Sequence, residues 1–207
     1  NTLGTAWIDW VQRLAAVAQT GLTYAENQYD RERYEILREI ASEIASSYSG
    51  LKLEEVRGLF ALETGYATPK VDTRAVVFRG DSLLLVRERS EGLWTLPGGW
   101  ADVGDSPSEA VEREVLEESG YQCRADKLLA VFDRRKQGHT PFPFHAFKLI
   151  FRCELLSGSP RLSHEIDGVE FFPESEIPSL SLSRTTPSQI KRAFEHHRHP
   201  ELPADFD

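Results

Sequence analysis

The chain has 207 residues, of which 40% are hydrophobic and 28% charged, and its formal net charge is −9. This composition excludes wholesale disorder and is typical of a soluble globular protein with one full domain and a smaller attachment. No apolar run approaches the roughly 20 residues that span a bilayer, and no signal-peptide pattern opens the chain, so no membrane partner is expected. The acidic balance argues against a nucleic-acid binder, but it allows a small anionic substrate if cations bridge the two.

Two cysteines, Cys123 and Cys153, are too few for a disulfide framework and lack the spacing of a metal site. Both lie in segments with a strand-like pattern, which predicts buried free thiols. A cytoplasmic location is the expectation that follows.

The first 62 residues favour helices from residue 5 onward. Apolar residues at helical spacing predict a first helix that ends at Gly21: Trp7, Val11, Leu14 and Ala18. A second helix is predicted to begin with a cap at Asp30 and to end at Gly50, and a third, shorter helix follows. Because Pro69 ends the helical character, we expect an all-helical domain over residues 1–66 and a second domain over residues 67–207.

The pattern changes at Val71. Residues 71–88 predict two strands joined by a tight turn at Gly80–Asp81. Further strands are predicted within three segments: 121–135, 144–156 and 169–172. A last helix, residues 187–199, starts with proline at its first turn, and its histidines (His196, His197 and His199) are expected at a solvated helix end. Strands with helices on their faces indicate a mixed α and β layer domain.

One helix is unusually well specified. Ser106 can cap it, Pro107 occupies its first position, and Glu109 completes a Ser-x-x-Glu capping box. Gly120 is suited to end it in a left-handed turn. The helix is therefore expected over residues 107–119.

The same helix carries three carboxylates within five positions: Glu114, Glu117 and Glu118. On a helical wheel Val111 and Val115 mark the buried face, and Glu118 lies within roughly 20° and Glu114 within roughly 60° of Val111. Carboxylates that border an apolar face repel one another, and each would have its pKa raised unless a cation neutralised them. Hard divalent ions, magnesium above all, take such oxygen ligands.

A solvated, salt-bridged helix is the alternative interpretation, with Arg113 pairing with Glu109 and Glu117 at four-residue spacing. The preceding loop favours the metal hypothesis. Gly98 and Gly99 let the backbone approach a ligand closely, and a glycine loop before a helix N-terminus often holds phosphate.

Together, loop and helix resemble the signature of the Nudix hydrolases. The stretch Gly99 to Tyr121, "GWADVGDSPSEAVEREVLEESGY", follows its pattern of Gly, five residues, Glu, seven residues, Arg-Glu-apolar-x-Glu-Glu-x-Gly-apolar. Asp105 alone departs from it, standing where glutamate is expected. Since that glutamate supports the loop in the family, Asp105 is left out of the metal site. The resemblance implies an α+β fold, an α/β/α sandwich with a mixed sheet, here preceded by the small all-helical domain.

The resemblance also implies a reaction, the attack of water on a pyrophosphate in a nucleoside diphosphate linked to another group. The family's metal ligands map onto Glu114, Glu118, Glu117 and the Gly98 carbonyl, for two or more Mg²⁺ (or Mn²⁺) ions in each active site. Besides Glu117, the residues implied in catalysis are Arg113, which holds the motif by salt bridges, and a general base in a later loop, Glu165 or else Glu170.

Segments outside the signature resemble a Nudix subgroup with a helical N-terminal domain: the N-terminal helices, "TPKVDTRAVVF", "VFDRRKQGHTPFPFHAFK" and "LSLSRTTPSQI". CDP-choline pyrophosphatase is the best-described activity of that subgroup, so we predict CDP-choline as substrate, cleaved to CMP and phosphocholine. ADP-ribose, cleaved to AMP and ribose 5-phosphate, is the alternative. The helical domain is expected to mediate a homodimer and to cover the substrate site.

Substrate-binding candidates lie in two groups. Arg134, Arg135 and His139, beside Lys136, form a basic cluster that suits a phosphate, although a solvated loop has the same composition. Trp100 and Phe144, and also Phe142, can stack on a nucleobase or a quaternary ammonium, and core packing is the alternative for each.

Two other functions share the motif. A non-catalytic Nudix nucleotide sensor would commonly have lost metal-binding carboxylates, and this chain keeps all three. An RNA-end-processing enzyme fits poorly with the negative charge. Hydrolysis is therefore the leading hypothesis.

Overall fold

The structure is a computed structural model that describes residues 6–207, so the predicted helix start at Thr5 lies outside the described residues. The chain divides into two compact units. One holds the residues up to Pro69 together with Pro141–His145, and the other holds Lys70–Thr140 and Ala146–Asp207. The predicted boundary after residue 66 did not anticipate that Pro141–His145, far along the chain, groups with the helices.

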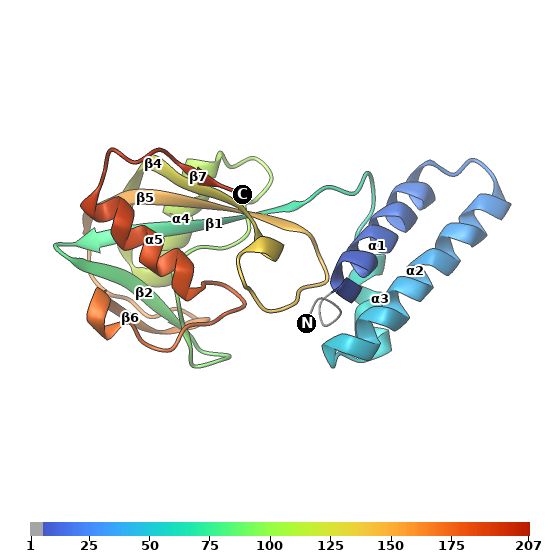
Figure 1. The fold of residues 1–207 in the computed structure, drawn as a ribbon, viewed down its shortest axis with the longest axis horizontal. Coiled ribbons are helices and arrows are strands. Elements are labelled where there is room, and N and C mark those ends of the chain that lie inside the picture. Colours follow the sequence, from blue (N-terminus) through green and yellow to red (C-terminus); the bar gives the residue numbers. More distant parts are fainter. Residues whose placement is uncertain (1–5) are drawn as a thin grey trace. The chain divides into compact units, whose positions relative to one another are not determined.

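The helical unit contains α1 (Ala6–Tyr24), α2 (Gln28–Ser49) and α3 (Leu53–Ala61) (Figure 1). Its apolar cluster draws on all three helices: Trp7, Val11, Ala41, Ala45, Val56 and Phe60. Phe144 packs against this cluster, with its ring 6.0 Å from that of Phe60. The segment Pro141–His145 thus completes the core of the helical unit.

Two predicted helix boundaries in this unit are wrong for identifiable reasons. Gly21 does not end α1, because it lies at a close crossing where a Cβ atom would meet the Tyr34 ring at 2.3 Å. Asn27 caps α2 in place of Asp30, and its side chain accepts the Asp30 N–H at 2.9 Å. Gly50 ends α2 in the left-handed conformation, as predicted.

The second unit is built on a mixed sheet of seven strands in the described residues. The strands are β1 (Lys70–Arg79), β2 (Ser82–Glu88), β3 (Trp94–Thr95), β4 (Tyr121–Asp133), β5 (Ala146–Gly158), β6 (Ile166–Pro173) and β7 (Asp205–Phe206). Their order is β3-β2-β1-β5-β4-β7, with β6 also paired to β2. The parallel pairing of β1 with β5 and the antiparallel pairings of β1 with β2 and β4 with β5 make the sheet mixed.

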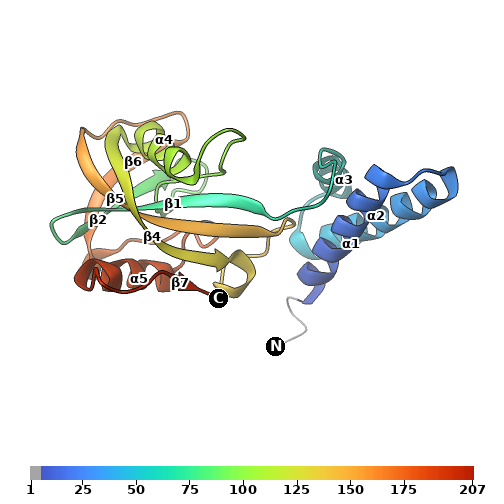
Figure 2. The same cartoon turned by 90° about the horizontal axis from the view of Figure 1, so that it is seen from above.

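Helices α4 (Pro107–Ser119) and α5 (Pro187–Arg198) cover opposite faces of this sheet (Figure 2). Along β1, Ala75 and Val77 pack in the cluster on the α4 side, whereas Val76 and Phe78 pack on the α5 side. This alternation is what a strand buried on both faces requires. The predicted α+β fold, an α/β/α sandwich preceded by an all-helical segment, is confirmed.

The histidines at the end of α5 differ from their prediction. His196 is 3% exposed, and its Nε2 lies 3.1 Å from Asp205 Oδ2, so it belongs to the buried contacts of β7. His197 stacks on Phe78 with 3.8 Å between ring centroids. His199 alone of the three is exposed at the helix end. The free thiols Cys123 and Cys153 are buried, as predicted.

No helix within residues 6–207 is both long and apolar enough to cross a membrane.

Candidate active site

Helix α4 has the predicted bounds and caps. The Ser106 hydroxyl accepts the Glu109 N–H at 3.3 Å, while the Glu109 carboxylate accepts the Ser106 N–H at 2.9 Å. Gly120 ends the helix with a φ of 77°. Val111 and Val115 are fully buried against the sheet. The local sequence therefore fixes the direction in which the carboxylates of α4 project.

The carboxylates differ in their burial. Glu118 is 9% exposed, and its Oε2 accepts the Gly98 N–H at 2.9 Å. Burial raises the pKa of Glu118 to about 8, and the nearby Arg74 and the Gly98 N–H offset that rise only in part. Burial likewise raises the pKa of Glu114, whose side chain is 15% exposed. Glu117 is more open, at 59%.

Arg113 joins the loop to the helix by four ion pairs of 2.9 to 3.3 Å: with Asp102, Asp105, Glu114 and Glu117. Glu109, the other partner expected for Arg113, has its carboxylate engaged in the capping box with Ser106 instead. Asp105, despite its shorter side chain, still reaches Arg113 Nε at 3.1 Å. The structure thus gives Arg113 and Asp105 the loop-supporting contacts expected from the motif.

Among residues 6–207, no three Asp, Glu, His or Cys side chains stand together in an arrangement that could hold a metal ion. The reason is visible in the contacts: Arg113 holds Glu114 and Glu117, while Glu118 points to the Gly98 N–H. The three predicted ligands share one helix but do not form a ready-made site. A cation would have to compete with Arg113 for Glu114 and Glu117, and with the Gly98 N–H for Glu118.

The glycines before the helix do allow a close approach. At Gly98, with φ of 139°, a Cβ atom would lie 2.0 Å from the Thr73 carbonyl oxygen. At Gly99 it would lie 2.9 Å from Glu114 Oε2. A side chain at Gly98 would push the loop away from β1, so glycine is needed there, whereas one at Gly99 would require the Glu114 carboxylate to shift.

A buried charged group at the start of β1 was not predicted. Arg74 donates hydrogen bonds to both carboxylate oxygens of Asp72, at 2.8 and 3.0 Å, and to the Leu96 carbonyl at 3.1 Å. Lys148 on β5 lies 3.0 Å from Asp72 Oδ1. The signal was present in the sequence, since Asp72, Arg74 and Lys148 interrupt otherwise apolar strand patterns.

Glu88 is a second residue that sequence reasoning missed. It ends β2, is 5% exposed, and pairs with Arg184 Nε at 2.8 Å. Burial raises the pKa of Glu88, and the negative charge of Glu165 adds to the rise. Glu165, the predicted base, is therefore near Glu88. It is an exposed residue next to β6. Glu170, the alternative base, is exposed on β6.

The predicted basic cluster is dispersed. Arg134 is 8% exposed and donates to the Ser183 carbonyl at 3.0 Å, whereas Arg135 pairs with Asp133 at 2.7 Å. His139 Nδ1 lies 2.9 Å from the Leu182 carbonyl oxygen and its Nε2 lies 3.0 Å from the Gln189 amide nitrogen. Burial lowers the pKa of His139 to about 4, so this histidine is neutral near pH 7. The cluster is thus divided, because Arg134 is buried whereas Arg135 and Lys136 are exposed.

The aromatic candidates for substrate stacking also differ in their surroundings. Phe144 packs in the helical unit, with Phe142 5.7 Å away, so its contacts are those of a core residue. The substrate-stacking role predicted for Phe144 has no support in these contacts. Trp100 is 43% exposed, and its backbone bridges to Asp72 beside the glycine loop. The stacking role of Trp100 stays a prediction.

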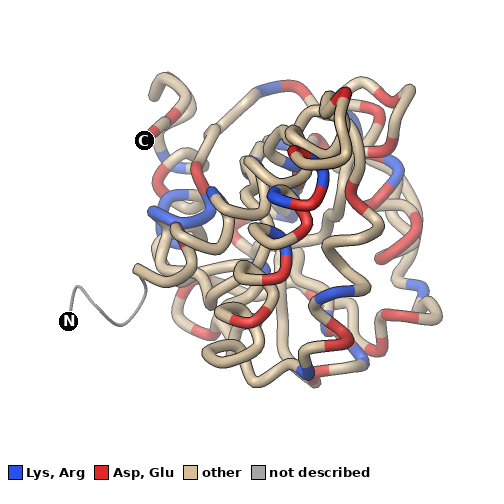
Figure 3. Tube along the Cα trace, turned by 90° about the vertical axis from the view of Figure 1, so that its right-hand side faces the viewer, with Lys and Arg blue, Asp and Glu red and all other residues tan. Residues whose placement is uncertain are grey.

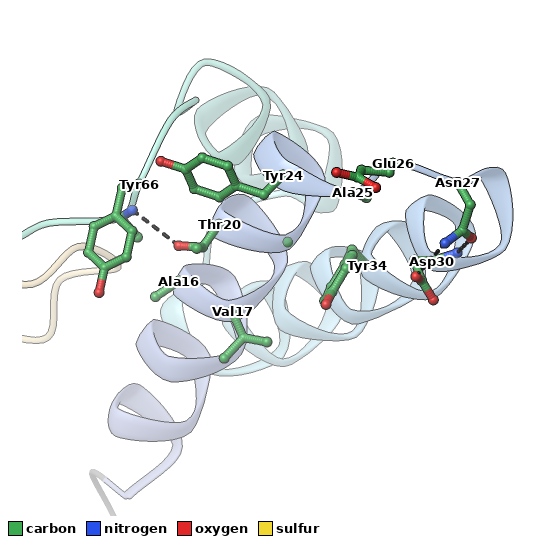
Figure 4. Close-up of a pocket in the computed structure, with 12 residues that line it drawn as sticks. Ala16, Val17, Thr20, Tyr24, Ala25, Glu26, Asn27, Asp30, Tyr34 and Tyr66 are labelled. Atoms are coloured by element: carbon green, nitrogen blue, oxygen red, sulfur yellow. Dashed lines mark hydrogen bonds between the residues drawn. The ribbon is translucent and has the colours of Figure 1, made fainter.

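The helical unit has a hollow of about 670 Å³ of its own (Figure 4). Three tyrosines from different segments line it: Tyr24, Tyr34 and Tyr66. The Thr20 hydroxyl, also in its wall, accepts the Ala67 N–H at 3.2 Å. Glu26 and Asp30 are its acidic members, and no nucleophile-and-base pair lies among its residues.

Charges are mixed over the molecule. The 33 acidic residues outnumber the 24 lysines and arginines, and Figure 3 shows the two kinds interspersed along the trace.

Two family models match the chain. Residues 5–60 match a UDP-X-like, N-terminal oligomerisation domain, and residues 68–194 match the NUDIX domain. The chain belongs to the Nudix family, and it is a hydrolase of the pyrophosphatase type that acts on nucleoside diphosphate-linked compounds.

Two relatives cover nearly the whole chain. It is 43% identical over 203 residues, 98% of each chain, to a Bacillus subtilis protein named "Putative ADP-ribose pyrophosphatase YjhB". A crystal structure of a UDP-X diphosphatase is 35% identical, with a TM-score of 0.64 and 98% of each chain covered. An ADP-ribose pyrophosphatase from Streptococcus suis is 37% identical with a TM-score of 0.62, over 68% of this chain and 100% of that one.

Proposed function

We propose that this enzyme is a metal-dependent ADP-ribose pyrophosphatase that releases AMP and ribose 5-phosphate. One observation carries the choice of substrate: the 43% identity, over nearly the full length, to the Bacillus subtilis protein whose name includes that activity. The motif region supports the reaction type, since buried carboxylates, a glycine loop and a supporting arginine lie together on α4 and the loop before it.

The donors near α4 fit a hard divalent cation. All are oxygens, and burial raises the pKa of Glu114 and Glu118, while Arg113 and Arg74 offset the rise only in part, so a cation would stabilise the ionised carboxylates further. Glu114, Glu118, Glu117 and the Gly98 carbonyl would hold Mg²⁺ or Mn²⁺. When bound, such ions polarise phosphoryl oxygens and make a water acidic enough to attack near neutral pH.

The chain's own groups would orient and complete the reaction. Arg113 keeps the loop and the helix in register through its four carboxylate partners. Glu165, exposed beside the buried Glu88, takes the proton of the attacking water on its carboxylate. Trp100, at the edge of the glycine loop, stacks on the nucleobase.

CDP-choline, the substrate predicted from the sequence, gains no support from the relatives and is kept as a competitor in the test. The UDP-X diphosphatase similarity adds UDP-sugars to that test. A nucleotide sensor is disfavoured because all three carboxylates of the motif are present on α4.

We also propose that the enzyme is a homodimer joined through the helical unit and that it works in the cytoplasm. The match to an oligomerisation domain over residues 5–60 supports the assembly. So do exposed apolar residues seven positions apart on α1, Trp10, Val17 and Tyr24, since this spacing aligns them in one stripe. Val17 and Tyr24 also line the hollow in Figure 4, which a second copy would cover.

The first experiment is a product analysis. Protein with Mg²⁺, and then with Mn²⁺, is incubated with ADP-ribose, CDP-choline or a UDP-sugar, and the products are separated by anion exchange. We expect AMP and ribose 5-phosphate, formed about 100-fold or more slowly by Glu118→Gln, since even the outer partners of metal ligands cost 10–100-fold. CMP and phosphocholine as the faster products would restore the sequence-based substrate. Binding of these compounds without turnover would favour the sensor.

A further inference from the structure

Lys148 is the most deeply buried charge in the second unit, at 1% exposed. It lies opposite Asp72 in the β1–β5 register and opposite Phe132 in the β4–β5 register. Because Ile150, two residues later, packs in the α5-side cluster, alternation puts Lys148 on that same face. The ammonium is therefore built into the sheet and not carried on a surface loop.

The carboxylate of Asp72, which lies beside Lys148, also pairs with Arg74. Asp72 already receives two aligned hydrogen bonds from Arg74. Lys148 Nζ lies 3.0 Å from one of the same oxygens, yet no acceptor in the described residues is aligned for a hydrogen bond with it. One carboxylate thus faces two buried cations, and an ammonium with three donors is left with one ion-pair contact.

Two arginines increase the local positive potential. Burial above all, and then the positive charges of Arg74 and Arg134, lower the pKa of Lys148 to about 8, against the opposing effect of Asp72. A buried cation in such surroundings costs free energy that a purely structural residue would avoid, because a buried hydrophobic side chain of similar volume is often as stable or more so. The arrangement therefore favours an anion as the missing partner.

The charged group of Asp72, Arg74 and Lys148 also lies near Glu118 of the Nudix motif. Arg74, which grips Asp72, is close enough to Glu118 to act on its pKa. The carboxylates of α4 repel a phosphate unless a cation lies between, whereas the ammonium of Lys148 attracts it directly.

We infer that Lys148 binds a phosphate oxygen of the substrate's pyrophosphate directly, without a metal ion. This inference deepens the proposed function and rests on it for the identity of the substrate. Access requires movement of the segment after β4, whose short turn η1 (Arg134–Lys136) contacts β5. Three hydrogen bonds hold that segment to the carbonyls of Leu182 and Ser183, from Arg134, His139 and Thr140.

The test uses inorganic pyrophosphate as the probe, in EDTA so that no divalent cation contributes. Isothermal titration compares the full-length protein with Lys148→Met, and with Lys191→Met as the matched control, since Lys191 is exposed on α5. We expect binding by the unmodified protein and by the control, and at least a tenfold weaker binding by Lys148→Met. Thermal melting accompanies each titration, and Lys148→Gln replaces the methionine variant if that one does not fold.

Equal binding by the Lys148 variants and the unmodified protein, or no binding by any of them, overturns the inference. A lysine that merely balances Asp72 would instead lower the melting temperature on substitution and leave the affinity of the folded protein unchanged. The result is independent of turnover. Loss of hydrolysis in the product analysis with Lys148-dependent binding intact would reject the proposed function alone.

Discussion

At the scale of single residues, helix α4 contains one side chain that stabilises the site, Arg113, and one whose ionised form is disfavoured by burial, Glu118. Arg113 satisfies four carboxylates at once, which only the forked guanidinium can do. Glu118 is held in a buried position where its ionised form is disfavoured. Arg113 thus fixes the loop against the helix, while Glu118 is a buried carboxylate that a bound cation would stabilise in its ionised form. We interpret this combination as characteristic of a cation-binding site.

Replacing Arg113 with lysine should lower kcat by about 10-fold to 100-fold, because a single ammonium cannot hold the loop and the helix together. KM should change less, since Arg113 contacts no predicted substrate group. Steady-state kinetics on ADP-ribose measures both. Arg124→Lys, in the exposed pair with Glu154, is the matched control and should behave as the unmodified enzyme. An unchanged kcat for Arg113→Lys would show that its ion pairs are dispensable.

His139 gives a prediction on pH. Its pKa is about 4 in the folded protein, below the ordinary value near 6.5, because burial and the neighbouring Lys148 disfavour the charged ring. The unfolded chain therefore binds a proton that the folded chain does not, and the stability from His139 is complete above pH 6.5 and is lost as the pH falls toward 4.

Urea unfolding at pH 7 and pH 5 measures this effect. We expect the unmodified protein to lose more free energy of unfolding over that interval than His139→Asn does. His199→Asn, at an exposed histidine, should show the same loss as the unmodified protein. Parallel losses in all three proteins would mean that His139 titrates normally.

At the scale of elements, the bounds of the motif helix α4 were predictable, and those of the N-terminal helices α1 and α2 were less so. The capping box at Ser106 and Glu109 and the stop at Gly120 are local signals, and they gave the bounds of α4 correctly. Gly21 and Asp30 gave wrong bounds because their roles depend on neighbours: a crossing helix at Tyr34, and a better cap at Asn27. Local chemistry decides an element's end only where no tertiary contact competes.

Gly120 should be the most sensitive end of α4. Its φ is positive, and an added Cβ would lie 2.6 Å from the Ser159 carbonyl oxygen, so Gly120→Ala combines backbone strain with a clash. We expect a loss of about 1–3 kcal/mol in the free energy of unfolding. Gly104→Ala, also at positive φ but with nothing within 4 Å, is the matched control for backbone strain alone. Denaturant unfolding of both variants should give the larger loss at Gly120, and equal losses would discount the clash.

At the scale of the whole molecule, the helical unit has exposed apolar side chains that lie in stripes along its helices. Ile36 on α2 is 59% exposed, with Tyr29 seven residues before it and Ile40 four after it, at 74% and 39%. Such a stripe on a helix normally faces a partner. Together with the stripe on α1, it is the surface that we assign to the homodimer.

Ile36→Glu should convert the dimer to a monomer, because burying the carboxylate in that interface is costly. Sedimentation velocity measures the mass directly. Leu62→Glu is the matched control, since Leu62 is 81% exposed and lies outside both stripes. A dimer that survives Ile36→Glu would exclude this stripe, and a monomeric unmodified protein would exclude the proposed assembly.

The sequence by itself determined the class of fold, the motif helix with its caps, and the family, because these depend on residue spacing along one segment. It also placed Glu118 at the edge of the buried face, since the helical period alone sets that. It did not reveal the Asp72–Arg74–Lys148 group or the partners of Glu88, whose members lie on different strands or segments and meet through sheet register and packing. Tertiary structure decided also that His196 is buried and that Phe144 packs with helices far away in sequence, because burial is a property of the folded chain and not of any one segment.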